Sequence, residues 1–100
     1  MSTAYRAEFL ASRPGAASVH DADLAMITSA VVGVIDEHCI VDHDHLRASL
    51  VTDSIVSVAV PFRAASYSDA SAISEQASRS VWGWSVEHQV SAVSPARRSR

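Results

Sequence analysis

The chain has 100 residues, of which 48% are hydrophobic, and a formal net charge of −3. This length predicts a single domain, which we place at residues 1–93, followed by a flexible basic tail at 94–100. The acidic balance argues against a general nucleic-acid binder, because such proteins carry a basic face on the fold itself. The single cysteine excludes an internal disulfide and favours a reducing, cytoplasmic setting. The chain lacks the roughly 18–20 consecutive apolar residues of a membrane span, and its first residues do not resemble a secretory signal.

The first half of the chain predicts helices. Residues 4–10 form a short helix with Tyr5, Phe9 and Leu10 as apolar anchors, which Pro14 and Gly15 bring to an end. Residues 16–20 are a linker. Residues 21–38 form a long amphipathic helix, because apolar side chains recur there at steps of three and four and Asp21 is a good N-cap.

Residues 44–62 fit two patterns. Val51, Ile55, Val58 and Phe62 fall on one side of a helix, whereas residues 56–62 also alternate as a strand does. We expect a helix over residues 44–59, stopped by Pro61, although the β-branched residues favour a strand.

The second half is expected to be less regular. Residues 63–79 are rich in serine and alanine and predict a mobile loop with a weak helix after Asp69. Residues 82–90 alternate as a strand with Trp82 and Trp84 on one face. The expected fold is therefore mostly α, a small helical bundle with an extended or β C-terminal segment and a disordered basic tail.

The segment His38–His45 concentrates residues that bind metals or protons: His38, Cys39, Asp42, His43, Asp44 and His45. Their spacing matches no standard zinc motif. The simpler interpretation is a helix end followed by an N-cap, since a histidine suits the C-terminal end of the helix dipole. A metal site at His38, Asp42, His43 and His45 is the alternative, and we expect no cofactor.

Catalysis is not predicted. The chain contains no Gly-x-Ser-x-Gly elbow, and its three glycines form no phosphate-binding loop. Cys39 directly beside His38 is not a catalytic arrangement, because such pairs meet from distant positions in a chain. We expect a protein that is not an enzyme.

Two segments are candidates for binding a partner. Trp82 and Trp84 either cover the core or form an exposed anchor, and tryptophan is enriched at interface hot spots. The tail residues Arg97, Arg98 and Arg100 either stay solvated or dock on an acidic partner or on phosphates.

The layout of residues 4–10, 21–24, 29–39 and 82–88 resembles that of the small head-to-tail connector (adaptor) proteins of long-tailed phages. The resemblance implies a structural assembly subunit without catalysis, which forms a homo-oligomeric ring in the virion. The ring would dock on the portal, or on another neck protein, and surround DNA that it does not bind specifically. An acidic body suits such a channel, because like charges repel. A small metal-binding protein and a small regulatory protein that binds through Trp82 and Trp84 remain alternatives.

Overall fold

The computed structural model describes residues 2–13, 15 and 18–93. The elements follow in the order β1 (Thr3–Ser12), α1 (Asp21–His38), β2 (Ile40–Val41), the 3-10 helix η1 (His43–His45), β3 (Arg47–Thr52), β4 (Ile55–Ala64), α2 (Tyr67–Ser78) and β5 (Ser85–Ala92). Neither α1 nor α2 is long and apolar enough to cross a membrane. The tail, and with it the expectations for Arg97, Arg98 and Arg100, lies outside the described residues.

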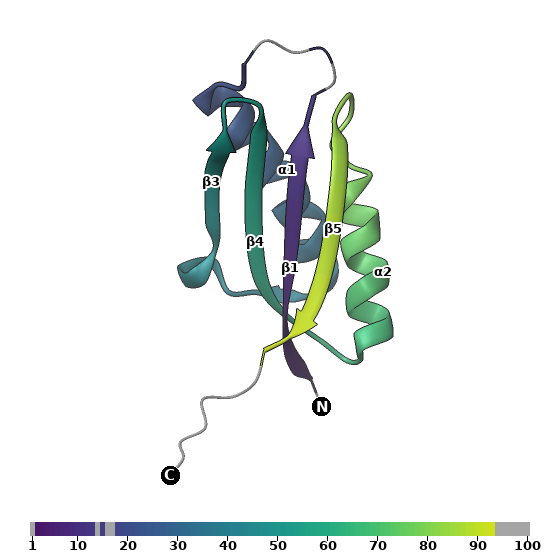
Figure 1. Cartoon of the computed structure of the whole chain (residues 1–100). Helices are drawn as coiled ribbons and strands as arrows, with labels where there is room; N and C mark the ends of the chain where they lie inside the picture. The colour runs from purple at the N-terminus through teal and green to yellow at the C-terminus, as the bar shows by residue number, and fades with distance from the viewer. Residues whose placement is uncertain (1, 14, 16–17, 94–100) are drawn as a thin grey trace.

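The strands form one antiparallel sheet (Figure 1). β4 and β1 lie in the centre, β5 pairs with β1, and β2 and β3 both pair with the outer side of β4. Both helices lie behind this sheet (Figure 1). Because β2 and β3 pair with the same side of β4, they act together as one interrupted edge strand. The elements then follow the β-α-β-β-α-β order of the ferredoxin-like, split β-α-β topology. The predicted helical bundle is therefore wrong, and the fold is α+β.

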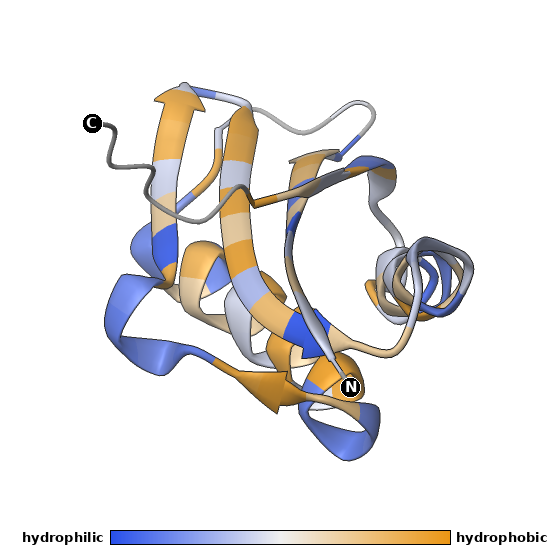
Figure 2. Ribbon diagram, turned by 90° about the horizontal axis from the view of Figure 1, so that it is seen from below, coloured by the Kyte–Doolittle hydropathy of each residue, from blue (hydrophilic) through white to orange (hydrophobic). Residues whose placement is uncertain are grey.

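The core lies between the sheet and the helices. Along β1 the buried residues Tyr5, Ala7, Phe9 and Ala11 alternate with more exposed ones, and β4 does the same with Val56, Val58, Val60 and Phe62. This period of two is that of a strand with one buried face. The ribbon is accordingly banded between apolar and more polar residues (Figure 2). Ile27, Val31 and Ile35 of α1 close the core from the other side.

The helix expected at residues 4–10 is strand β1, and the helix expected at 44–59 is the β3–β4 hairpin. The β-branched side chains of residues 55–60 fit the pleated surface better than a helix, where they lose rotamer freedom. The alternating pattern that competed with the helix was the correct one.

Pro61 lies inside β4 and does not end an element. Val41 faces Phe62 and Arg47 faces Ala59, so η1 interrupts the edge strand opposite Pro61. The missing N–H of Pro61 therefore has no strand to pair with, while its carbonyl accepts from the Asp42 N–H at 2.9 Å. This interruption allows a proline within a central strand.

The helix expected at residues 21–38 is confirmed as α1, although its N-cap is His20 and not Asp21. The His20 N–H donates to Asp23 Oδ2 at 3.0 Å. The loop expected at residues 63–79 is instead mostly α2, which begins earlier than predicted. Ser66 caps α2 by accepting from the Asp69 N–H at 3.1 Å.

Candidate partner-binding site

A tight connection joins α2 to β5 and exposes one of the two tryptophans. Trp82 is 90% exposed, and the following Gly83 has φ of +82°, a left-handed conformation that favours glycine. Trp84 is partly buried, and the Arg13 guanidinium lies 4.9 Å from the centre of its ring. The prediction that both tryptophans share one face of a strand is wrong, because β5 begins only at Ser85.

A cleft of about 690 Å³ lies between the C-terminal half of α2 and the first half of β5. One wall carries the ion pair of Arg79 with Glu75, whose Nη2 and Oε2 atoms are 2.6 Å apart. The cleft is lined by Glu75, Ser78, Arg79, Val81, Trp82, Gly83, Trp84, Val86 and His88. It therefore combines two indole rings, two valines and a neutralised ion pair.

A buried contact holds α2 against β5 at this cleft. Ser74 is fully buried, and its Oγ shares a 3.0 Å hydrogen bond with Nδ1 of His88. The His88 ring also stacks on Phe9, with 6.5 Å between the ring centres. Sequence reasoning missed this pair, because nothing in the spacing of a serine and a histidine fourteen residues apart marks a contact.

The outer edge of β5 is free of a strand partner among the described residues. The Val93 N–H donates to the Ala4 carbonyl, so the odd-numbered residues of β5 direct their backbone groups toward β1. It follows that Val86, His88, Val90 and Ala92 direct their N–H and C=O groups outward. Such groups are a template for another strand.

The two edges of the sheet differ. The edge formed by β2 and β3 is interrupted by η1, and the pairing of β3 with β4 has a register irregularity between Leu50 and Thr52. Both features discourage pairing with another chain. β5 is a regular strand of eight residues without proline, lysine or arginine. The protected and the open edge thus stand at opposite sides of the same sheet.

The His38–His45 segment divides into separate pairs. His45 Nδ1 lies 2.8 Å from Asp42 Oδ2, and His43 Nε2 lies 3.8 Å from Asp36 Oδ1, both on the exposed surface. His38 lines a different cleft. Within the described ranges, no three His, Cys, Asp or Glu side chains gather as a metal site would require. Asp42 does act as a cap, since its Oδ1 accepts from the Asp44 N–H at 3.2 Å.

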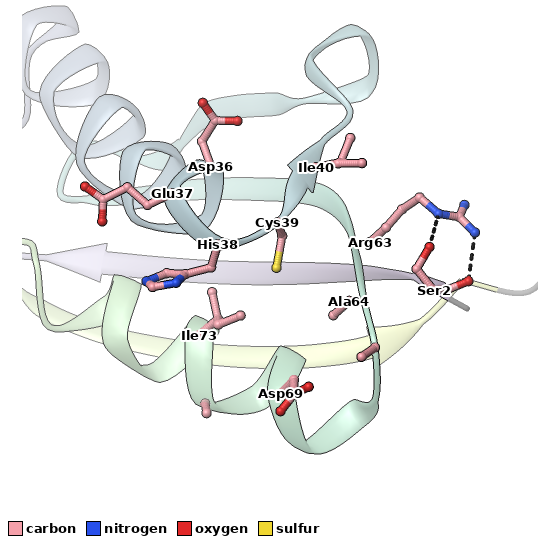
Figure 3. A pocket seen from close by; sticks show the side chains of 12 residues that line it. Ser2, Asp36, Glu37, His38, Cys39, Ile40, Arg63, Ala64, Asp69 and Ile73 are labelled. Atoms are coloured by element: carbon pink, nitrogen blue, oxygen red, sulfur yellow. Dashed lines mark hydrogen bonds between the residues drawn. The ribbon is translucent and has the colours of Figure 1, made fainter.

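A second cleft, of about 900 Å³, opens between the end of α1 and the start of α2 (Figure 3). The Cys39 sulfur points toward Ile73 and Asp69 of α2 in this view. Burial raises the pKa of the Cys39 thiol, and the nearby Asp69 carboxylate raises it further. The Arg63 guanidinium donates to Ser2 Oγ and to the Ser2 carbonyl, both at 2.9 Å. This cleft therefore holds a protonated thiol and an arginine that is already engaged, a weaker basis for chemistry than the cleft beside β5.

The chain matches no protein-family model, no curated protein and no solved structure. A ferredoxin-like topology by itself does not determine function. The cleft and the open edge of β5 therefore carry the functional interpretation.

Proposed function

We propose that this protein is a non-catalytic binding module that holds an extended segment of a partner protein between α2 and β5. The observation that carries the proposal is the 90% exposure of Trp82 beside a cleft whose other border is an unpaired strand edge. Tryptophan is enriched at interface hot spots, so an exposed indole beside a cleft is a suitable anchor for a partner.

The partner segment would add to the sheet as a further strand. Val86 and His88 border the cleft and direct their backbone groups outward, so a segment lying there would gain hydrogen bonds from its own backbone. Strand addition of this kind supplies affinity from the main chain and specificity from alternate side chains.

The position of each partner residue opposite β5 determines which kind of side chain is favoured there. Partner residues opposite Val86 and His88 would point to the same side of the sheet as these two residues, toward α2 and the cleft. Apolar side chains suit that environment of valine and indole. The partner residue between them would lie opposite Glu87, where a lysine or arginine is favoured because opposite charges attract across strands. The preferred segment therefore reads apolar, basic, apolar.

A random-peptide display library selected against the full-length protein tests this proposal. Selected peptides should carry the apolar-basic-apolar pattern and lose about thirtyfold or more in affinity for Trp82→Ala, as expected for a hot spot worth about 2 kcal/mol. Val51→Ala is the matched control, because Val51 is 56% exposed at the opposite edge of the sheet. Peptides that bind Trp82→Ala and Val51→Ala with the same affinity as the original protein would refute the proposal.

The narrower expectation of a phage connector stays a prediction. Residues 4–10, the first part of that layout, form strand β1, so the resemblance now depends on α1 and on the extended C-terminal segment alone. A portal or other neck protein would then supply the extended segment. A pull-down of purified neck proteins with original and Trp82→Ala protein tests this version.

A further inference from the structure

Within the part of the chain that the structure describes, the second face of the sheet carries no helix, and its residues alternate with those of the core. Leu10 is 45% exposed on this face. Ile40 and Val93 lie at one end of the same face, in register with Arg63 and Ala4, and are 73% and 39% exposed. We propose that a second copy of this chain covers the face, so that two sheets pack against each other in a symmetric dimer. This inference does not depend on the proposed function, because it leaves the backbone groups at the outer edge of β5 free, although both proposals use the Glu87 side chain.

The size of the face is sufficient for a specific dimer. The residues of the five strands, each covering about 4.8 Å across and 3.4 Å along the sheet, span roughly 590 Å². Two copies would bury about 1,200 Å² in total, which is the lower end of the range of about 1,200–2,000 Å² for stable interfaces.

The shape of the face also suits a second sheet. Ser57, Ala59 and Pro61 of the central strand β4 are small and partly buried, whereas the neighbouring strand β1 carries the exposed Arg6–Glu8 ion pair on the same face. A second sheet therefore approaches to about 10 Å where its small β4 residues lie over this ion pair. A hollow of about 200 Å³ at one end is lined in part by Ala4, Ile40, Pro61 and Val93. These apolar residues would lose contact with water in the dimer.

Charge determines the direction of the symmetry axis. Arg47 lies on the β3 side of the face at the level of Gln89, and Glu87 lies on the β5 side two residues away, about 7 Å along the strands. A two-fold axis parallel to the strands places the β3 side of one copy over the β5 side of the other, which brings Arg47 near Glu87 of the second copy. An axis across the strands at the level of Arg47 and Glu8 would instead place Arg47 over Arg47 and Glu8 over Glu8, and like charges repel.

A nucleic acid is a poorer occupant for this face. Single strands bind sheets by stacking their bases on aromatic side chains. Tyr5, Phe9 and Phe62 all belong to the buried side of the sheet, and the net charge of −3 repels phosphates.

Charge reversal with rescue tests the dimer. Native mass spectrometry and sedimentation should give twice the 10.7 kDa mass of one chain. Arg47→Glu and Glu87→Arg should each weaken the dimer about tenfold, because symmetry breaks two pairs at once. The double reversal should restore it. Within one copy the two strands stand three spacings apart, about 14 Å, so the rescue requires contact between copies.

Two further variants separate this dimer from other associations. Leu10→Glu places a charge on this face, two residues from the end of β1, and should give a monomer with unchanged secondary structure, whereas Trp82→Ala should leave the dimer intact. A monomer at all soluble concentrations would overturn the inference. A dimer that withstands Leu10→Glu, or that the double reversal does not restore, would overturn it as well. A dimer that persists while peptide selection fails would refute the proposed function alone.

Discussion

Ser74 Oγ and His88 Nδ1 lie 3.0 Å apart and connect α2 to β5 beside the candidate binding cleft. Ser74 is fully buried, so its hydroxyl depends on His88 for a partner from another element. Ser74→Ala should lower the free energy of unfolding by about 1 kcal/mol, because the imidazole nitrogen loses its partner inside the protein. Urea denaturation measures this, with the exposed Ser68→Ala as control. Equal stabilities of the two variants would show that the contact contributes nothing.

The conformation of the turn that holds Trp82 can be tested at Gly83, with Gly33 of α1 as the control. A β carbon would contact nothing within 4 Å at either position, but only Gly83 has a left-handed φ, of +82°. Gly83→Ala should therefore destabilise the protein by about 1–2 kcal/mol through the backbone. Gly33→Ala in the exposed part of α1 should stabilise it by up to about 1 kcal/mol. Thermal denaturation tests both, and effects of the same sign would contradict the account of the turn.

Cys39 should react slowly with alkylating agents near neutral pH. Burial and then Asp69 raise the pKa of its thiol, so the thiolate forms only at higher pH than in an unfolded chain. A raised pKa of this acid contributes stability below the pKa of the unfolded thiol, and that contribution is lost as the pH rises through the folded value.

The pH dependence of the iodoacetamide reaction measures this shift. Asp69→Asn should lower the pKa and speed the reaction near neutral pH, because it removes the carboxylate charge. Asp36→Asn is the control, since Asp36 lines the same cleft but does not contribute to the shift. Faster alkylation of the folded protein than of the unfolded chain would contradict the prediction.

Replacing both His43 and His45 by alanine should change stability by less than about 1 kcal/mol. Their side chains are 59% and 72% exposed, and exposed ion pairs contribute little. Chelator should alter neither the melting temperature nor the metal content of the original protein. Metal that co-purifies with the original protein and is lost in the double variant would support the alternative of a metal site.

The success of sequence reasoning followed the strength of the local pattern. α1 was predictable, because Leu24, Ile27, Val31 and Ile35 repeat at helical steps. β1 was missed because two of its buried residues are alanines, Ala7 and Ala11, which favour helices and disguise the alternation. The sequence of β4 fits both a helix and a strand pattern. Pro61 predicts a helix end, because the interruption of the edge strand at η1, which allows a proline within β4, depends on tertiary structure.

The candidate site was predictable in part. Trp82 was identified from its residue type, but its separation from Trp84 depends on the start of β5 and on the conformation of Gly83. The open edge of β5 is a property of sheet order, which no single segment encodes. The pairing of Ser74 with His88 likewise depends on how α2 lies against the sheet.

Backbone amide exchange along β5, measured by NMR with and without a selected peptide, tests the central claim most directly. In the free protein the amides of Glu87, Gln89 and Ser91 should be protected, whereas those of Val86, His88, Val90 and Ala92 should exchange rapidly. Peptide binding should protect Val86 and His88 while leaving the first set unchanged. Binding that leaves the outward amides in rapid exchange, or outward amides that are already protected in the free protein, would contradict strand addition at this edge.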